Sequence, residues 1–199
     1  ANTYSGTTTI TAGTLRTSGA ANVIPDGSEV VNNATLQLNG ADETIAGLSG
    51  TDTNAAITRS VAGALTLTLS RTTGTLNYLG RIQNGSGTLS VVKAGAYTQV
   101  FGGANTYSGS TTVNAGILRA NSNGAFSPNS DHILANTAGV ELDMTGYDMS
   151  IASLQGGGTT GGLVRLGTAA LTLSGNGTYT YSGRILGEGI AGGLVKLGT

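Results

Sequence analysis

Ala1–Arg16 reads ANTYSGTTTITAGTLR, and Ala104–Arg119 reads ANTYSGSTTVNAGILR. The two segments lie 103 residues apart and are identical at 12 of their 16 positions. The match resumes downstream at the same offset, where Gly80-Arg81-Ile82 aligns with Gly183-Arg184-Ile185. In a chain of 199 residues, this repetition predicts two copies of one unit: residues 1–103, and a truncated second copy at residues 104–199.

Within each unit the local pattern is strand and turn. Leu65–Leu69 reads LTLTL and Thr88–Val91 reads TLSV, alternations that place apolar side chains on one face of a strand. Tight-turn residues such as Asn84–Gly87 punctuate these segments, and the 34 glycines disfavour long helices. The all-β pattern leaves a sandwich, a barrel or a solenoid. Strand segments that recur at about 20–30 residues favour a β-solenoid, with both units in one continuous solenoid of about eight or nine coils.

Composition excludes several classes of function. Only 10% of the residues are charged and the formal net charge is −1, which argues against a nucleic-acid partner. The absence of cysteine removes disulfides, thiolate metal sites and a cysteine nucleophile. No apolar run approaches the roughly 18 residues of a membrane-spanning helix. No phosphate-loop or calcium-repeat motif is present, so the sequence predicts no cofactor and no metal.

The segment Gly87–Arg119 carries a family resemblance. It reads GTLSVVKAGAYTQVFGGANTYSGSTTVNAGILR and resembles the passenger-associated transport repeat of autotransporters, also called the autotransporter-associated β-strand repeat. The family pattern runs roughly G-x-L-x-K-x-G-x-G-x-L-x-L-x-G-x-N-T-Y-x-G-x-T-x-V-x-x-G-x-L. The chain departs from it at Ala96–Phe101, where the family has G-x-L-x-L.

This resemblance implies a right-handed parallel β-helix in the secreted passenger of a Gram-negative autotransporter, at the cell surface or in the extracellular space. It also implies a C-terminal β-barrel translocator in the parent protein. A host-cell or carbohydrate ligand would then bind outside this segment. Because both ends of the sequence fall inside the repeat, we also expect end-to-end self-association of the chain.

The predicted site residues are structural residues of the repeat motif, and no catalytic residue is predicted. They are Asn2, Thr3, Tyr4, Gly6, Gly13, Leu15, Lys93, Gly95, Asn105, Thr106, Tyr107, Gly109, Gly116, Leu118 and Lys196. The asparagines are expected to cap backbone groups at turns. The tyrosines could present a flat face to a sugar, but their recurrence with each repeat favours a structural role.

The remaining chemistry-bearing residues are interpreted as structural or solvated. His132 is the only histidine and is expected in a surface turn at Asn129–His132, with Asp131 pointing the opposite way. Among the clustered carboxylates, Glu141 and Asp143 would share one face of a strand and could form a glycosidase-like pair or a weak cation site, but solvated turn charges are favoured. The candidates are Asp42, Glu43, Glu141, Asp143 and Asp148. The glycine-rich run Gly156–Gly162 is expected to be a turn within the solenoid.

Basic residues recur with the repeat and predict a charged stripe along the rod that protects the sheet edges. The recurring pairs are Lys93 and Lys196, Arg16 and Arg119, and Arg81 and Arg184. The preferred function is a non-enzymatic stalk of a surface adhesin. Two alternatives stay open: a subunit of a self-assembling extracellular fibre, and a fragment of a β-helical polysaccharide-degrading enzyme.

Overall fold

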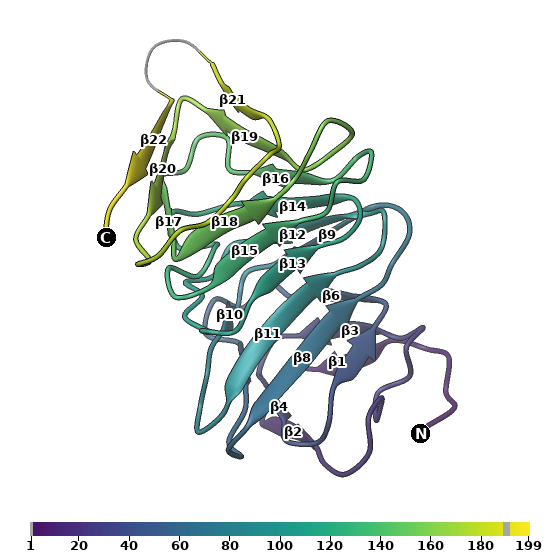
Figure 1. Cartoon of the computed structure of the whole chain (residues 1–199). Coiled ribbons are helices and arrows are strands. Elements are labelled where there is room, and N and C mark those ends of the chain that lie inside the picture. Colours follow the sequence, from purple (N-terminus) through teal and green to yellow (C-terminus); the bar gives the residue numbers. More distant parts are fainter. Residues whose placement is uncertain (1, 189–191) are drawn as a thin grey trace.

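The chain forms a parallel β-solenoid. The computed structural model describes residues 2–188 and 192–199, in which the backbone forms 22 strands and no helix. The strands wind through about eight turns, with the N- and C-termini at opposite ends of the stack (Figure 1). This confirms the solenoid predicted from the sequence; its right-handed winding stays a prediction. No helix that could cross a membrane occurs in the described residues.

Each coil passes through three faces in a constant order. The first face contains β1 (Thr8–Ile10), β3 (Glu29–Asn32), β6 (Gly47–Ser49), β9 (Thr75–Tyr78), β12 (Thr98–Phe101), β14 (Ile117–Ala120), β16 (Glu141–Asp143), β19 (Leu163–Gly167) and β21 (Ile185–Gly187). The second contains β2 (Thr14–Thr17), β4 (Thr35–Leu38), β7 (Ala56–Thr58), β10 (Arg81–Ile82), β17 (Met149–Ile151), β20 (Ala170–Leu173) and β22 (Gly193–Lys196). The third contains β5 (Glu43–Ile45), β8 (Ala64–Leu69), β11 (Thr88–Lys93), β13 (Thr111–Val113), β15 (Asp131–Leu134) and β18 (Ser153–Gly156).

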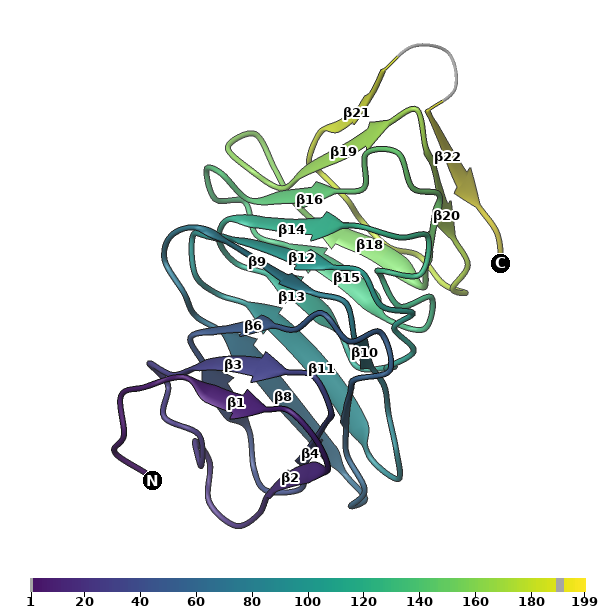
Figure 2. The same cartoon turned by 180° about the vertical axis from the view of Figure 1, so that it is seen from behind.

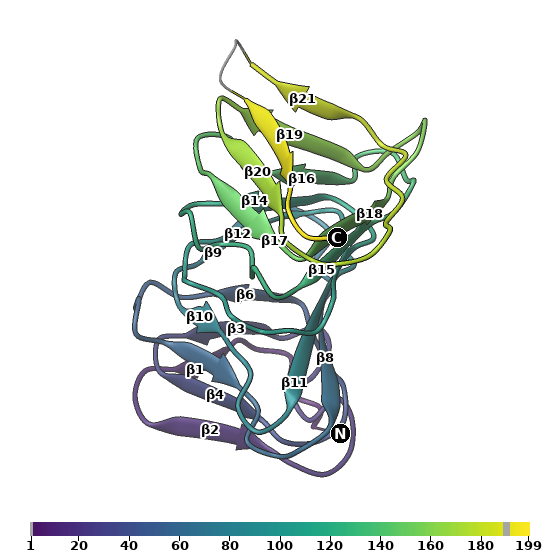
Figure 3. The same cartoon turned by 60° about the vertical axis from the view of Figure 1, so that its left-hand side comes forward.

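All strand pairs in the described residues are parallel. Figure 2 shows the first face from β1 to β21, where a bridge between Gly50 and Tyr78 joins its two sheets. Figure 3 brings strands of the second face into view at both ends of the stack. Paired residues in successive coils are 18 to 28 positions apart, as with Val30–Leu48 and Gly50–Tyr78. The coils therefore differ in length, and the difference lies in the turns.

The core is a column of inward side chains. In β11 the burial alternates, with Leu89 and Val91 fully buried and the residues between them half-buried. Because the strands pair in parallel register, similar side chains lie over one another in successive coils. Leu89 lies against Leu65 and Val91 against Leu67. This is the period-2 pattern that the sequence shows, since successive side chains of a strand point to opposite faces.

The two copies of the sequence repeat lie on different faces. β1 and its repeat equivalent β13 occupy the first and third faces, while β2 and its equivalent β14 occupy the second and first. β12 lies four coils above β1 on the first face, and β13 follows two faces later. One repeat unit therefore advances by four coils and two further faces.

The predicted charged stripe is wrong for this reason. Arg16 lies on the second face and Arg119 on the first, and Lys93 lies on the third face and Lys196 on the second. Residues that recur in the sequence are thus rotated around the shaft and do not line up along it.

Candidate functional site: the repeated NTYSG turn

Asn105 connects three coils. Its side chain is buried, its Oδ1 accepts a hydrogen bond from the Ile82 N–H (2.6 Å), and its Nδ2 donates to the carbonyl of Ala125 (2.6 Å). Ile82 lies on the coil below and Ala125 on the coil above. The side chain satisfies two buried backbone groups where the second face has no strand, which explains why the motif needs an amide here. In the first copy Asn2 Nδ2 donates to the carbonyl of Val23 (2.8 Å).

Tyr107 begins a chain of hydroxyl groups. Its phenol lies 2.6 Å from Thr111 Oγ1, which lies 2.8 Å from Ser130 Oγ. Ser130 Oγ donates to the carbonyl of Gly109 (2.6 Å) and so closes the turn onto the next coil. Burial raises the pKa of Tyr107 to about 12, so the phenol stays protonated at neutral pH.

The first copy repeats this chain of contacts. Tyr4 lies 2.6 Å from Thr8 Oγ1, Thr8 lies 3.0 Å from Ser28 Oγ, and Ser28 donates to the carbonyl of Gly6 (2.7 Å). Tyr4 is 43% exposed because it lies on the first coil, whereas Tyr107 is fully covered. The hydroxyl group of the recurring tyrosine therefore makes the same chain of contacts in both copies, but only Tyr107 is covered by neighbouring coils.

The other motif residues hold the turn and the strand that follows it. Thr3 and Thr106 are exposed, and the Thr106 backbone N–H donates to the carbonyl of Ile82 (3.0 Å). Gly13 and Gly116 have φ angles of 72° and 67°, in the left-handed region that favours glycine. Leu118 is fully buried in β14, while Leu15 on the first coil is 37% exposed.

Lys93 is a buried residue, which corrects its prediction as part of a surface stripe. Its ammonium donates hydrogen bonds to the carbonyls of Gly95 and Ala115, and lies 4.0 Å from the centroid of the Tyr97 ring. Burial lowers the pKa of Lys93 to about 8. Ala115 belongs to the following turn, so the lysine ties the end of β11 to the coil above. Lys196 is exposed on the last coil and donates to the carbonyl of Gly175 (2.9 Å).

The candidate carboxylates do not form a cluster in the described residues. Glu141 pairs with Arg165 (2.9 Å) and Asp143 with Arg119 (2.7 Å), across neighbouring strands of the first face. Burial alone would raise the pKa of Asp143, but hydrogen bonds from Thr145 and Arg119 hold it below the usual value. These side chains join coils, and no group of three or more potential metal ligands occurs in residues 2–188 and 192–199.

The other three candidates cap backbone groups. Asp42 accepts from the Thr66 N–H (2.8 Å) and Asp148 from the Ala170 N–H (2.8 Å). Glu43, expected to be solvated, is buried and accepts from the N–H groups of Val23 (3.1 Å) and Ile24 (2.7 Å). Burial raises the pKa of Glu43, and the two hydrogen bonds only partly offset this effect.

His132 lies in the core and not in a surface turn. It is fully buried in β15, with its Nδ1 3.1 Å from the carbonyl of Ser130 and its ring centroid 5.6 Å from that of Phe126. Burial lowers its pKa to about 4. Asp131 points outward, as predicted, and accepts from Ser153 Oγ (2.5 Å). The Nε2 of the ring has no hydrogen-bond partner among the described residues, so they do not form a catalytic triad around it.

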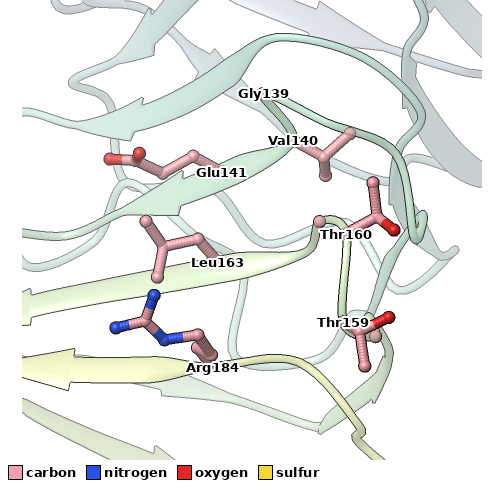
Figure 4. Close-up of a pocket in the computed structure, with 9 residues that line it drawn as sticks. Gly139, Val140, Glu141, Thr159, Thr160, Leu163 and Arg184 are labelled. Carbon is pink, nitrogen blue, oxygen red and sulfur yellow. The ribbon is translucent and has the colours of Figure 1, made fainter.

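A shallow hollow of about 220 Å³ lies beside the glycine-rich turn, as Figure 4 shows. Glu141 on β16 and Arg184, just before β21, lie on one side of it with Leu163 of β19 between them, and Thr159 and Thr160 lie on the turn at the other. The N–H groups of Thr160 and Gly161 already bind Asn136 Oδ1, at 2.9 and 3.0 Å. They are therefore not free to hold an anion, and the turn serves the solenoid, as predicted.

The chain shows two similarities to known proteins. The profile of the passenger-associated-transport-repeat family matches residues 1–16 and 91–120. These ranges contain both NTYSG turns, and the second also contains Lys93. No solved structure matches the chain significantly.

A curated relative extends the similarity beyond the motif. The adhesin BmaC autotransporter of Brucella suis biovar 1 (strain 1330) is 42% identical over 170 residues, which is 84% of this chain. The chain spans only 4% of the length of that relative. The chain thus carries the repeats of an autotransporter passenger and is similar, over most of its length, to a short segment of an autotransporter adhesin.

Proposed function

We propose that this chain is a non-enzymatic shaft segment of an autotransporter passenger, exposed at the surface of a Gram-negative bacterium. In this role it holds an adhesive part of the parent protein away from the cell. The parent would carry a C-terminal translocator, and any host-cell or carbohydrate ligand would bind elsewhere in it. The similarity to an autotransporter adhesin supports this setting.

One observation carries the proposal: in the copy that has coils on both sides, three polar side chains of the motif point into the solenoid and not to the solvent. Asn105, Tyr107 and Lys93 are buried, and each makes hydrogen bonds within the solenoid. A binding or catalytic motif needs side chains that a ligand can reach. A motif made of contacts between coils instead produces a stiff stack, since each coil is held by the one below and the one above.

The polysaccharide-degrading alternative has less support. Such an enzyme would need an accessible carboxylate pair. Glu141 and Asp143, the pair that shares one strand, are each engaged by an arginine from a neighbouring coil. The solenoid therefore uses this pair to join strands.

The test replaces this segment in the full-length parent protein displayed on cells. One variant lacks the segment, and a second carries an unrelated β-solenoid with the same number of coils. If the segment is a shaft, the replacement should restore the reach and adhesion that the deletion loses. Adhesion that stays lost with the replacement, while surface display is normal, would show that the segment itself binds. Release of reducing ends from polysaccharides by the purified chain would contradict the non-enzymatic role.

A further inference from the structure

The first face of the solenoid has a break between β6 and β9. The two strands belong to separate sheets, and the bridge between Gly50 and Tyr78 is the one pairing that the structure describes between them. On the third face of the same two coils, β8 and β11 pair along six residues. On the second face, β7 and β10 pair along two residues. These two coils are therefore held together mainly on the third face.

The side chain of Gln99 fills this break. Gln99 is buried on β12, one coil above β9, and its Nε2 donates to the carbonyl of Leu48 on β6 (3.0 Å). The N–H of Leu48 donates to Gln99 Oε1 (3.4 Å), which also accepts from the Tyr97 hydroxyl (2.8 Å). The amide thus pairs with both backbone groups of Leu48, as a neighbouring strand would. By the spacing of the family pattern Gln99 stands where the family has leucine, so this departure of the chain serves the break.

An ion pair crosses the break on the outside. Arg71, in the turn before β9, donates to Glu29 of β3 (2.9 Å), and the other oxygen of Glu29 accepts from Ser49 Oγ (3.0 Å). The Arg71 and Glu29 side chains are 38% and 24% exposed. Water and salt screen such a pair, so it holds the break less firmly than a backbone ladder would.

The break recurs with the sequence repeat. Ile45–Gly50 reads IAGLSG, and Ile151–Gly156 reads IASLQG 106 residues later. In both segments the last glycine forms an isolated bridge to the next coil, with Tyr78 in the first copy and with Tyr181 in the second. The break is therefore a feature of the repeat unit.

We propose that this break is a joint of the shaft. The first face opens between β6 and β9, the paired strands β8 and β11 act as the hinge on the third face, and Gln99 latches the joint closed. Opening on the first face breaks one bridge and a few side-chain contacts, whereas opening on the third face would break a ladder of six residues. A fold opens locally where it loses least.

The joint gives the proposed shaft a place to bend. A solenoid that is stiff elsewhere would yield here to a sideways load and keep its coils. This purpose rests on the proposed function, but the opening is measured on the purified chain without reference to adhesion. The two proposals can therefore fail separately.

Hydrogen exchange of the folded chain tests the opening. The N–H groups of Gly50 and Leu79 form the bridge, at 3.0 and 2.9 Å from their acceptors. Those of Thr88 and Ala94 cross the same coil boundary on the third face, at 2.9 and 2.8 Å, and are the matched control. The bridge amides should have protection factors at least about ten-fold lower than the control amides. Equal protection of the two pairs would overturn the proposal.

Two kinds of variant separate the joint from its hinge. Leu67→Ala weakens β8, which stays paired when the joint opens, so it should speed exchange at Thr88 and Ala94 and leave the bridge amides unchanged. Equal acceleration of all four amides would mean that the two coils open as one unit, against the proposal.

The latch is tested with Gln99→Leu, which leaves the backbone groups of Leu48 unpaired and should speed exchange of the bridge amides by about ten-fold or more. Glu29→Gln removes only the outer ion pair, is the milder variant, and should speed the same amides by about two- to five-fold. Bridge amides that do not respond to either variant would contradict the latch.

Spin labels test the direction of opening, since the chain has no cysteine of its own. Cysteines at Val31 and Ile117 place two labels on the outer side of the first face, and cysteines at Thr44 and Ile133 place two on the third face. Each pair spans four coil steps, or about 19 Å. The first-face pair should show the broader distance distribution, extended to longer distances, while the third-face pair stays narrow. Equal widths on the two faces would overturn the hinge.

Discussion

Asn105 accepts a hydrogen bond through its Oδ1 from the backbone N–H of Ile82, one coil below, at a distance of 2.6 Å. The pair lies 23 residues apart in the sequence, close to the length of one coil. In this coil no strand forms on the second face, and the Asn105 side chain supplies the hydrogen bonds that strand pairing supplies in other coils. The motif asparagine is thus a part of the ladder between coils.

Replacing Asn105 with alanine should destabilise the solenoid strongly. The change leaves the N–H of Ile82 and the carbonyl of Ala125 buried without partners, and each unsatisfied group costs about 1–3 kcal/mol. Asn2→Ala is the matched control and should cost less than about 1 kcal/mol, because Asn2 is exposed. Urea unfolding followed by circular dichroism measures both. Equal losses would show that the burial of these hydrogen bonds does not determine the effect.

The inward rows should dominate the stability. Leu67→Ala and Leu171→Ala should each cost about 2–5 kcal/mol, since both side chains are buried. Thr66→Ser, on the outward side of the same strand as Leu67, should stay within about 0.5 kcal/mol. The alternation also predicts Leu173 in the inward row, but this side chain is only half-buried, so its alanine variant should fall between these limits. Denaturant titrations that rank Leu173 with Leu171 would contradict this order.

Gly13 and Gly116 occupy equivalent positions after the motif strand. A side chain at either would be equally strained, but the two positions differ in the free space around them. Gly13 and Gly116 both have positive φ, so alanine at either should cost about 1–2 kcal/mol in backbone strain. A Cβ at Gly116 would also meet the backbone of Ala96 and Tyr97, whereas nothing lies within 4 Å of one at Gly13. Gly116→Ala should therefore lower the melting temperature more than Gly13→Ala. Equal losses would mean that strain alone sets the cost, and the reverse order would contradict the prediction.

His132 should make the solenoid sensitive to acid. Its pKa is lowered to about 4 in the fold, from 6.5 when exposed, so the unfolded chain binds a proton that the folded chain does not bind between these values. The free energy of unfolding should fall as the pH drops from about 6.5 to 4, by up to about 1.4 kcal/mol per pH unit, and this contribution should level off below pH 4.

The control for the acid effect is His132→Leu, which matches the leucines of the neighbouring inward positions. Urea titrations from pH 7 to pH 4 should show a smaller slope for the variant, because carboxylates such as Glu43 contribute equally to both chains. A slope that does not change would assign the acid sensitivity to the carboxylates.

The period-2 alternation of residues along each strand predicts which side chains are buried better than the polarity of each residue does. Lys93 follows Leu89 and Val91 at intervals of two, His132 stands two before Leu134, and Glu43 stands two before Ile45. Each polar residue therefore occupies an inward position, and each is buried. Polarity suggests exposed sites for these residues, because charged side chains are seldom buried without partners. The spacing is the signal that could have placed them correctly.

The position of each repeat on the shaft could not be predicted in the same way. The sequence offset is 103 residues, but paired positions in successive coils differ by 18 to 28 residues. The number of coils in one unit depends on where each turn places its extra residues. Turn lengths follow from backbone geometry at many glycines together, and no pattern in the sequence marks the face on which a strand falls. The motif and the fold class were thus predictable, while the rotation between copies was not.

The advance of four coils and two faces has a consequence for a long array. Three units of this kind would turn through fourteen coils and bring the first motif back to its starting face, after roughly 67 Å. A partner that binds the shaft from one side would find the same surface only at that interval. Turns of different length, and hence of different flexibility, would be spread evenly around the axis. Such a rod would resist bending equally in every direction.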